Sequence, residues 1–410
     1  MTKPPPANTR DVRSPIRGWC PRGARPMWAA DGALIRLRLP GNRIRAGQLA
    51  ALVPIARRHA ANGVMVTRRA KLELRGVAEP EAAIAELGRA GLLETGPAAD
   101  VPDVLVLADQ HDDHGAHRLD ESLRDRLSRV GSIQRLADKF LIVIDGGGPF
   151  SAPALSADIR LDAIGDGRWR LGLAGGRFDA APAAELGAAA VGEAVAGIIE
   201  KRLMDTRAER LRGLSDTALR DFLSADAPAN GPVPTAEPRA GLGYDDALGW
   251  RVRFVFGVLS IDALAVLAEV IGDASVGLLP DRRLVLPKQA WIARDRLYQH
   301  DAIDDDADPR NGLSACIGRM GCRWASTDTR ADALALAARA PEIARRGLHV
   351  SGCAKGCARR APSAATLVGR HGRYDLIRDG APSDAPHATG LTWAEAGRAL
   401  TPRAGKAGGR

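Results

Sequence analysis

The chain has 410 residues, which is enough for two or more domains with cores of their own. Its net charge of +9 favours an anionic partner, but the basic residues are spread along the chain and aromatic residues, which would stack on bases, make up only 4% of it. These features argue against nucleic acid and favour a small polyanion. No apolar run reaches the length of a membrane span, and the start of the chain lacks the apolar core of a signal peptide, so we expect a cytoplasmic protein without membrane contact.

The first ordered unit is expected after a loose, polar and proline-rich arm. Within that arm Cys20 stands alone, and we interpret it as a small buried residue rather than a metal ligand. Residues 34–39 alternate apolar and basic side chains, as a strand with one buried face does. Residues 48–59 carry apolar side chains at helical spacing, and residues 64–67 and 71–75 have the pattern of two more strands. The sequence therefore predicts a β-α-β unit followed by a further strand.

A polar segment with three histidines follows, from Asp109 to His117. Imidazole and carboxylate groups suit non-haem iron, so His111, His114 and His117 are candidate ligands. The segment has no apolar side chains that would bury it, and we favour a surface loop for that reason.

The β-α-β pattern recurs later in the chain. Residues 252–256 form an expected strand, residues 261–270 a helix, and residues 275–279 and 283–286 two strands. This order repeats that of the first unit, so the chain contains an internal repeat.

The segments that follow each unit also correspond. Residues 141–148 parallel residues 348–352, and residues 164–169 parallel residues 368–374. A stretch rich in Pro, Ala and Gly, residues 224–243, is the expected linker between the copies. The chain therefore reads as a duplicated module.

Four of the five cysteines lie in the second copy, in two pairs flanked by glycine. Cys316 and Cys322 form C-x5-C, and Cys353 and Cys357 form C-x3-C about thirty residues later. Structural zinc uses tighter knuckles, and disulfides do not fit a cytoplasmic protein. A cubane iron–sulfur cluster fits better, because its four thiolates bind different corners. The flanking glycines would let the backbone approach the sulfides; they are Gly318, Gly321, Gly352 and Gly356.

These motifs resemble a known family. A-C-x-G-x-x-x-C followed by S-G-C-x-x-G-C-A-R resembles the cluster motif of nitrite and sulfite reductases, and residues 348–357 are most similar to the precorrin-3B synthases of aerobic cobalamin biosynthesis. The similarity extends from about Cys20 to about Leu391. It implies an α+β fold made of a duplicated nitrite/sulfite reductase-like module with pseudo-twofold symmetry. Each copy would contain a ferredoxin-like half-domain and a larger α/β half, with the cluster in the second copy only.

The resemblance and the repeat together suggest domain boundaries. The expected parts, in chain order, are a loose arm (1–25), the first ferredoxin-like half-domain (26–80), a clusterless reductase-like domain (81–223), the linker (224–243), the second half-domain (244–290), the [4Fe–4S]-binding domain (291–395) and a basic tail (396–410).

The resemblance implies an oxidoreductase, a monooxygenase that hydroxylates precorrin-3A at C20 with O2 and forms a γ-lactone. Precorrin-3A is a polycarboxylate tetrapyrrole, in agreement with the positive charge. The implied cofactor is a [4Fe–4S] cluster on the four paired cysteines, with NADH as the ultimate reductant; a non-haem iron stays open. No G-x-G-x-x-G fingerprint is present, so a separate reductase partner is a hypothesis. The alternative is a siroheme-dependent sulfite or nitrite reductase.

The resemblance also indicates substrate-binding residues. Arg69 matches an arginine that faces the macrocycle in the family, although Arg68 or Lys71 could equally be the inward residue. Lys139 matches the first of two proton-donating lysines, and Leu141 stands where the second is expected.

Two further points concern the basic residues. Arg36 and Arg38 share one face of the strand at 34–39, as candidates for carboxylate contacts or as an exposed face. Residues 102–107 lack the arginine of the family's V-R-N phrase. Reduction of sulfite or nitrite needs several proton donors, so the absence of the second lysine and of this arginine favours the monooxygenase.

Overall fold

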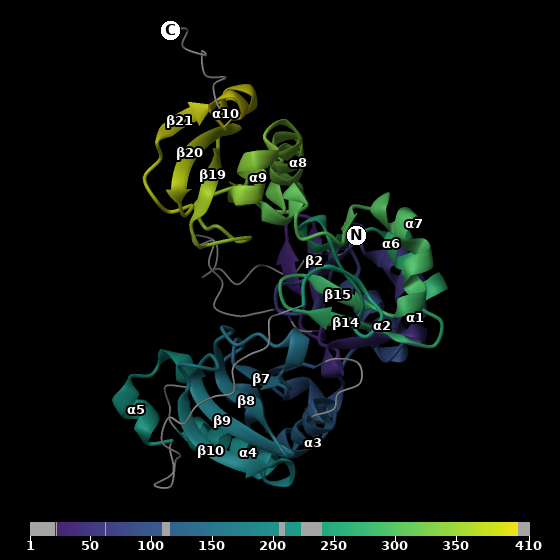
Figure 1. Cartoon of the computed structure of the whole chain (residues 1–410), viewed down its shortest axis with the longest axis vertical. Helices are drawn as coiled ribbons and strands as arrows, with labels where there is room; N and C mark the ends of the chain where they lie inside the picture. The colour runs from purple at the N-terminus through teal and green to yellow at the C-terminus, as the bar shows by residue number, and fades with distance from the viewer. Residues whose placement is uncertain are drawn as a thin grey trace.

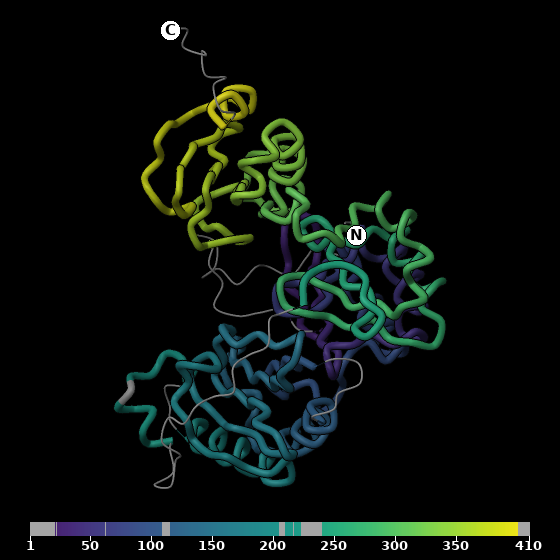
Figure 2. The backbone as a smooth tube through the Cα atoms, in the orientation of Figure 1, coloured from purple at the N-terminus to yellow at the C-terminus, as the bar shows by residue number. Residues whose placement is uncertain are grey.

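The computed structural model describes residues 21, 23–61, 63–108, 115–204, 210–222 and 240–400. It is a mixed α/β structure with three parts (Figure 1). We call residues 23–92 and 240–303 the central body, residues 96–220 the first lobe and residues 309–400 the second lobe. The smooth trace in Figure 2 shows the central body between the two lobes.

The central body contains two sheets and the helices that cover them. The first sheet has, in spatial order, β1 (Met27–Ala29), β2 (Gly32–Leu37), β5 (Leu72–Val77), β4 (Val64–Val66) and β13 (Val258–Leu259). The second has β11 (Gly243–Asp245), β12 (Gly249–Phe254), β15 (Arg283–Leu286), β14 (Ser275–Leu279) and β3 (Arg43–Arg45), with β16 (Ala302–Ile303) pairing with β12. The helices are α1 (Ala46–His59), α2 (Pro80–Arg89), α6 (Ile261–Val270) and α7 (Arg294–Tyr298).

The two sheets exchange a short strand with each other. β13 follows β12 in the chain but pairs with β4, and β3 follows β2 but pairs with β14. Both strands immediately precede a helix, α6 and α1 respectively. The exchange joins segments about two hundred residues apart, so neither sheet is complete without the other.

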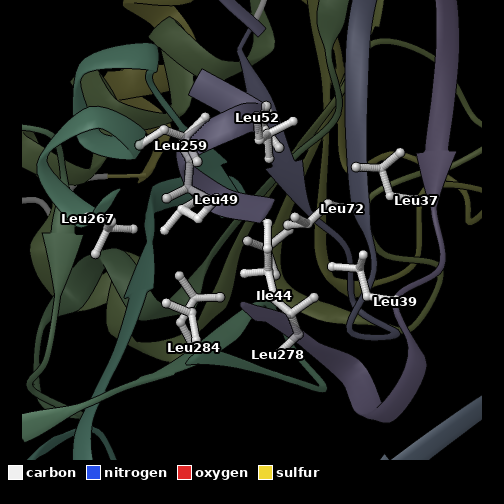
Figure 3. Close-up of a cluster of buried hydrophobic side chains, with 14 of the residues drawn as sticks. Leu37, Leu39, Ile44, Leu49, Leu52, Leu72, Leu259, Leu267, Leu278 and Leu284 are labelled. Carbon is white, nitrogen blue, oxygen red and sulfur yellow. The ribbon is translucent and has the colours of Figure 1, made fainter. Parts of the chain in front are cut away.

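The central body has one apolar core. Leu49 and Leu52 of α1 lie beside Leu259 and Leu267 of the later half, as Figure 3 shows. These leucines are 0 to 2% exposed. A contiguous core of this kind supplies most of the stabilisation of such an assembly, because each buried aliphatic side chain contributes about 1.5–3 kcal/mol.

The two lobes are built on sheets of the same order. The first lobe has β10 (Ala181–Gly187), β9 (Arg168–Gly175), β8 (Ala157–Gly165), β7 (Leu141–Asp145) and β6 (Asp103–Leu107); the second has β21 (Ala388–Leu391), β20 (Arg373–Gly380), β19 (Ser363–Arg370), β18 (Leu348–Ser351) and β17 (Leu313–Ala315). In each lobe the first three strands along the chain are parallel and the last two antiparallel.

Helices cover one face of each lobe's sheet. They are α3 (Ala116–Ser128), α4 (Ala188–Met204) and α5 (Asp216–Arg220) in the first lobe, and α8 (Thr329–Arg339), α9 (Pro341–Gly347) and α10 (Trp393–Leu400) in the second. The other face of the first lobe's sheet contributes Leu105, Leu107 and Val143 to the core of the central body. The first lobe is therefore fixed to the central body by apolar packing.

The structure confirms several expected elements and corrects the bounds of others: the strand expected at 34–39 spans Gly32–Leu37, and the helix expected at 48–59 spans Ala46–His59. The helix at 261–270 and the strands at 275–279 and 283–286 have the predicted bounds. The strand expected at 252–256 ends at Phe254, because Phe256 has a positive φ of 56° that breaks the extended backbone. The structure also gives the repeat a register, which the sequence comparison did not fix: Val143 pairs with Arg160 as His349 pairs with Thr366.

None of the helices among the described residues is both long and apolar enough to pass through a lipid bilayer.

Candidate functional site

All four paired cysteines lie at one edge of the second lobe's sheet. Cys316 directly follows β17, and Cys353 follows β18 after a single glycine. These two strands are parallel neighbours, so their carboxyl ends meet at the same edge. Cys322 follows a short turn, and Cys357 is reached within the loop that begins at Cys353. The topology therefore brings the two sequence motifs together.

The backbone around Cys316 approaches its sulfur closely. The N–H of Gly352 donates a hydrogen bond to Cys316 Sγ at 3.2 Å, and Thr329 Oγ1 donates to the carbonyl of Cys316 at 2.6 Å. A Cβ atom on Gly352 would lie 2.4 Å from Cβ of Ala325 and 3.4 Å from Cys316 Sγ. A glycine is therefore required where the two cysteine loops meet, as the sequence predicted.

The four sulfur atoms are close enough to influence one another. Burial raises the pKa of the Cys353 thiol, and the neighbouring Cys322 and Cys316 act in the same direction. Burial also raises the pKa of Cys357, and the three other cysteines add to that effect. A bound metal centre would reverse this tendency, because thiolates are the form that binds metal.

No three His, Cys, Asp or Glu side chains of the described residues converge closely enough to hold one metal ion. This finding gives no support to a single zinc ion. A cubane cluster makes a different demand, because each of its four thiolates binds a separate corner of a larger body.

His349 lies on β18 in the same part of the lobe. Its side chain is fully buried, and neither ring nitrogen has a hydrogen-bond partner among the described residues. Burial, and then the charge of Arg359, lowers the pKa of His349 to about 4. The imidazole is therefore neutral in the native protein at ordinary pH.

This burial predicts a pH-dependent stability. Between pH 6.5 and pH 4 the unfolded His349 binds a proton and the native one does not, so the free energy of unfolding falls by about 2 kcal/mol from pH 7 to pH 5. Chemical unfolding at both pH values should show a smaller loss for His349→Leu than for the wild type. His371→Asn, at the exposed β19–β20 turn, is the control and should behave as the wild type. An equal loss in His349→Leu and wild type would contradict the assignment.

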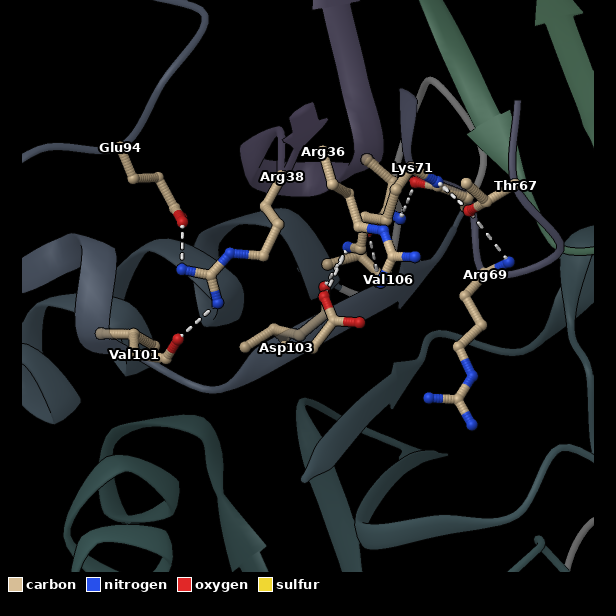
Figure 4. A network of polar contacts seen from close by, with 12 residues as sticks. Arg36, Arg38, Thr67, Arg69, Lys71, Glu94, Val101, Asp103 and Val106 are labelled. Carbon is tan, nitrogen blue, oxygen red and sulfur yellow. Dashed lines mark hydrogen bonds and ion pairs between the residues drawn. The ribbon is translucent and has the colours of Figure 1, made fainter. Parts of the chain in front are cut away.

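Arg36, on β2, and Arg38, just after it, are not simply exposed side chains. Arg36 Nη2 lies 2.5 Å from Glu73 Oε1, and Arg38 Nη2 lies 2.9 Å from Glu94 Oε2. Arg38 also donates to the carbonyls of Val101 and Ala99, and its side chain is 9% exposed (Figure 4). Both arginines therefore have acidic partners inside the protein.

Lys71 and Arg69, in the loop between β4 and β5, have separate environments. Lys71 is 2% exposed, and its ammonium group lies 3.0 Å from Asp103 and donates to the carbonyl of Val104. Burial lowers the pKa of Lys71, although Asp103 opposes this shift. Arg69 extends away from Lys71 in Figure 4, and its backbone forms a β-bridge with Pro280. Lys71 thus joins the first lobe to the central body. Arg69 lies where the turn between β4 and β5 contacts the turn between β14 and β15.

Lys139 is exposed, and its neighbour Asp138 lines a cavity of about 190 Å³. Arg25, Arg36, Arg38, Gln134 and Asp138 are among the residues that line this cavity, and Arg25 pairs with Asp138 at 2.6 Å. The cavity therefore brings Arg36 and Arg38 near the segment that carries Lys139.

The other candidates from the sequence are placed only in part. Cys20, His111 and His114 lie outside the described residues. His117 lies in the first turn of α3, where its Nδ1 would be 2.9 Å from a Cβ on Gly41.

The structure adds charged residues that the sequence did not indicate. Arg75 pairs with Asp31 at 3.2 Å, and a Cβ on Gly321, the neighbour of Cys322, would lie 2.8 Å from Asp31. This pair links the first sheet of the central body to the cysteine loops. The same junction contains Arg253, Arg282 and Arg330. The sequence signal for them is the internal repeat, because Arg282 lies in the loop of the second copy that corresponds to the Arg69 loop of the first.

Comparison with known proteins identifies the family. No protein-family model matches the chain. A precorrin-3B synthase of Sinorhizobium sp is 31% identical over 400 residues, which cover 92% of this chain and 86% of that protein. The chain belongs to the precorrin-3B synthase family. A solved structure, that of the Mycobacterium tuberculosis NirA protein, superimposes with a TM-score of 0.61 at 18% identity and covers 89% of this chain and 79% of that one. This likeness shows the fold alone and agrees with the nitrite reductase-like architecture expected of this precorrin-3B synthase family member.

Proposed function

We propose that this chain is a monooxygenase that acts on precorrin-3A. In this reaction one atom of O2 enters the substrate as the C20 hydroxyl group, the other leaves as water, and two electrons come ultimately from NADH. A γ-lactone then closes from the ring A acetate. The single observation that carries the proposal is the 31% identity to a precorrin-3B synthase, which extends over 92% of the chain.

A [4Fe–4S] cluster on Cys316, Cys322, Cys353 and Cys357 is part of the proposal. Three features support it: the position of both pairs at one sheet edge, the Gly352 N–H directed at Cys316 Sγ, and the influence of the neighbouring cysteines on the pKa of Cys353 and of Cys357. When bound, such a cluster supplies electrons one at a time. A non-haem iron for O2 activation and a reductase partner are further parts of the proposal.

The residues at two positions of the family's motifs support an oxygenase over an oxyanion reductase. Leu141, at the position of the second lysine, is fully buried in the core of the central body. Val104 to Leu107 are buried apolar residues, where the family's second arginine would stand. Proton donors are therefore absent from both positions, and six-electron reduction of an oxyanion depends on such donors.

The roles of the basic residues follow from their partners. Arg69 and Lys139 would hold substrate carboxylates directly, because a planar guanidinium grips a carboxylate in two places and an exposed ammonium acts as a point charge. Arg36 and Arg38 already pair with Glu73 and Glu94, so they would contribute by lining the cavity and orienting a carboxylate side chain.

The test is the absorption spectrum of protein purified without oxygen, with iron and acid-labile sulfide measured on the same sample. We expect a broad cluster band with no sharp macrocycle bands, and iron in excess of sulfide if a non-haem iron is also bound. Oxygen-dependent conversion of precorrin-3A by the same sample completes the test. Sharp siroheme bands, or a sample without sulfide, would overturn the proposal.

A further inference from the structure

The turn between β4 and β5 contacts the turn between β14 and β15, its counterpart in the second repeat. The backbone of Arg69 forms a β-bridge with Pro280, and the N–H of Asp281 donates to the carbonyl of Arg68 at 3.1 Å. The turn from the first repeat thus lies against the turn from the second. Arg68 from the first turn and Asp281 from the second lie 3.7 Å apart.

Three arginines from the second half of the chain gather at this place. Arg253 extends from β12, Arg282 from the turn after β14, and Arg330 from the first turn of α8. The Nε atom of each is buried and has no hydrogen-bond partner among the described residues. The acceptors that Arg253 and Arg330 do reach are weak: the Asn311 carbonyl at 3.5 Å and the sulfur of Met65 at 3.3 Å.

These guanidinium groups repel one another. Burial, followed by the charges of Arg253, Arg68 and Arg330, lowers the pKa of Arg282 to about 10. Burial and the charge of Arg75 lower the pKa of Arg330 to about 10 as well. The acid that opposes this in Arg282 is Asp281, which is half exposed and lies 3.7 Å from Arg68. Buried charges with few hydrogen-bond partners are unfavourable, so this arrangement persists at a cost in stability that a bound anion would relieve.

The backbone beneath the arginines is held in an unfavourable conformation. Asp281 and Arg282 have φ values of 62° and 65°, in the left-handed region, and Phe256 has 56°. A Cβ on Gly257 would lie 2.5 Å from Cδ of Arg282, so the arginine stem passes directly over this glycine. Such strain is kept mainly at functional sites, and here it directs Arg282 to the junction.

The arginine cluster lies next to the cysteine loops. Arg330 follows Thr329, whose hydroxyl donates to the Cys316 carbonyl and lies 3.7 Å from Cys316 Sγ. The Arg330 guanidinium also lies 6.0 Å from the ring centroid of Phe256, which keeps it at the interface of the second lobe and the central body. An anion bound to these arginines would therefore lie beside the proposed iron–sulfur centre.

We propose that Arg253, Arg282 and Arg330 form a second carboxylate-binding set, separate from Arg36 and Arg38, which binds acidic side chains of the tetrapyrrole. This inference rests on the proposed function for the substrate class. It assigns substrate recognition to both repeats, because Arg69 comes from the first and Arg282 from the second. A planar substrate edged with several carboxylates would bridge the two repeats, whereas a small oxyanion would reach one set only.

The experiment measures binding of a metal-free porphyrin with eight carboxylates, by quenching of its fluorescence. Arg282→Gln and Arg330→Gln are each expected to weaken binding about tenfold to a hundredfold, since each removes a charge-assisted contact. Arg282→Lys keeps the charge but loses the two-point grip, so we expect a smaller loss. Arg296→Gln is the matched control: Arg296 is half exposed on α7 and pairs with Glu269, and its loss should change affinity less than twofold.

A thermal melt of each variant separates loss of the site from loss of the fold. Removal of an uncompensated buried charge should leave the melting temperature of Arg282→Gln equal to or above that of the wild type, while binding weakens. Wild-type binding that is unchanged in both glutamine variants would overturn this inference and leave the proposed function standing. A wild type that binds the octamethyl ester as well as the octacarboxylate would overturn it too. A wild type that binds neither, and lacks sulfide, would overturn both.

Discussion

Replacing Cys353 by serine is expected to abolish the iron–sulfur centre. Iron and sulfide should fall from about four of each per chain to near zero, and the broad visible absorption should disappear with them. The reason is geometric: one corner of a cubane would lose its thiolate, and the serine hydroxyl is a harder and far less acidic ligand. Cys357→Ser should give the same result, because its sulfur lies in the same loop and interacts with the other three.

The fifth cysteine provides the control for this experiment. Cys20→Ser removes a thiol of the same chemistry that we do not expect to be a ligand, so iron, sulfide and absorption should stay at wild-type values. The variants should be purified and assayed without oxygen, because clusters with an incomplete ligand set are lost on oxidation. If Cys353→Ser kept the full iron and sulfide content, the four-cysteine assignment would be wrong.

The cysteine motifs show what can be predicted from the sequence. Two cysteine motifs about thirty residues apart, flanked by glycines, led to the prediction of one four-thiolate site. Parallel pairing of β17 and β18 brings both motifs to one sheet edge, and the four-thiolate site itself stays a prediction. The helix at Ile261–Val270 was equally accessible, because its apolar periodicity is unbroken over ten residues.

The contacts of the charged residues could not be predicted from the sequence. Arg36 and Arg38 alternate with apolar residues as a half-exposed strand does, but their partners Glu73 and Glu94 lie in distant parts of the chain. An alternating sequence pattern indicates that one face of a strand is buried. It does not indicate which charged residue contacts the other face. Arg282 could not be singled out either, because its burial depends on a turn from the other repeat.

The short strands and the register of the repeat could not be predicted from the sequence either. The exchanged strands β3 and β13 have three and two residues, too few for any periodicity to be recognised. The sequence comparison matched residues 141–148 with residues 348–352 without fixing a residue-by-residue register, whereas the strand pairing relates Val143 to Arg160 as it relates His349 to Thr366. In a strand, a shift of one residue moves each side chain to the opposite face, so the sequence alone did not show which face His349 occupies.

The strand pairing also shows what the first lobe has in place of the cysteine loops. At the carboxyl end of β7, Asp145 accepts hydrogen bonds from Ser151 Oγ and from the N–H of Gly147. Arg160 on β8 lies beside it, with its side chain fully buried. Its guanidinium binds Asp145, both oxygens of Asp162 at 2.8 and 2.9 Å, and the carbonyls of Ala152 and Leu155. A fully bonded ionic network thus fixes the loop that in the second lobe would be fixed by metal.

Replacing Arg160 by methionine should therefore be among the most destabilising single changes in the molecule. It leaves the carboxylates of Asp145 and Asp162, which are 0% and 6% exposed, without their shared cation, and breaking a buried pair in this way costs about 3–5 kcal/mol. For a lobe of this size the melting temperature should fall by on the order of 10 °C. Arg168→Met, on the neighbouring strand β9, is the matched control: Arg168 is 55% exposed and lies 3.9 Å from Glu185, so its loss should cost under about 1 kcal/mol.

A second variant separates loss of charge balance from loss of packing. If uncompensated carboxylates cause the effect, adding Asp145→Asn and Asp162→Asn to Arg160→Met should recover part of the stability, because no buried charge then stands alone. Urea unfolding followed by circular dichroism provides the free energies, and the iron and sulfide content of each variant reports whether the second lobe stays intact. A loss below 1 kcal/mol in Arg160→Met would show that water or a nearby cation replaces the arginine. Retention of iron and sulfide despite a destabilised first lobe would show that the two lobes fold as separable units, one closed by an ionic network and the other by its metal centre.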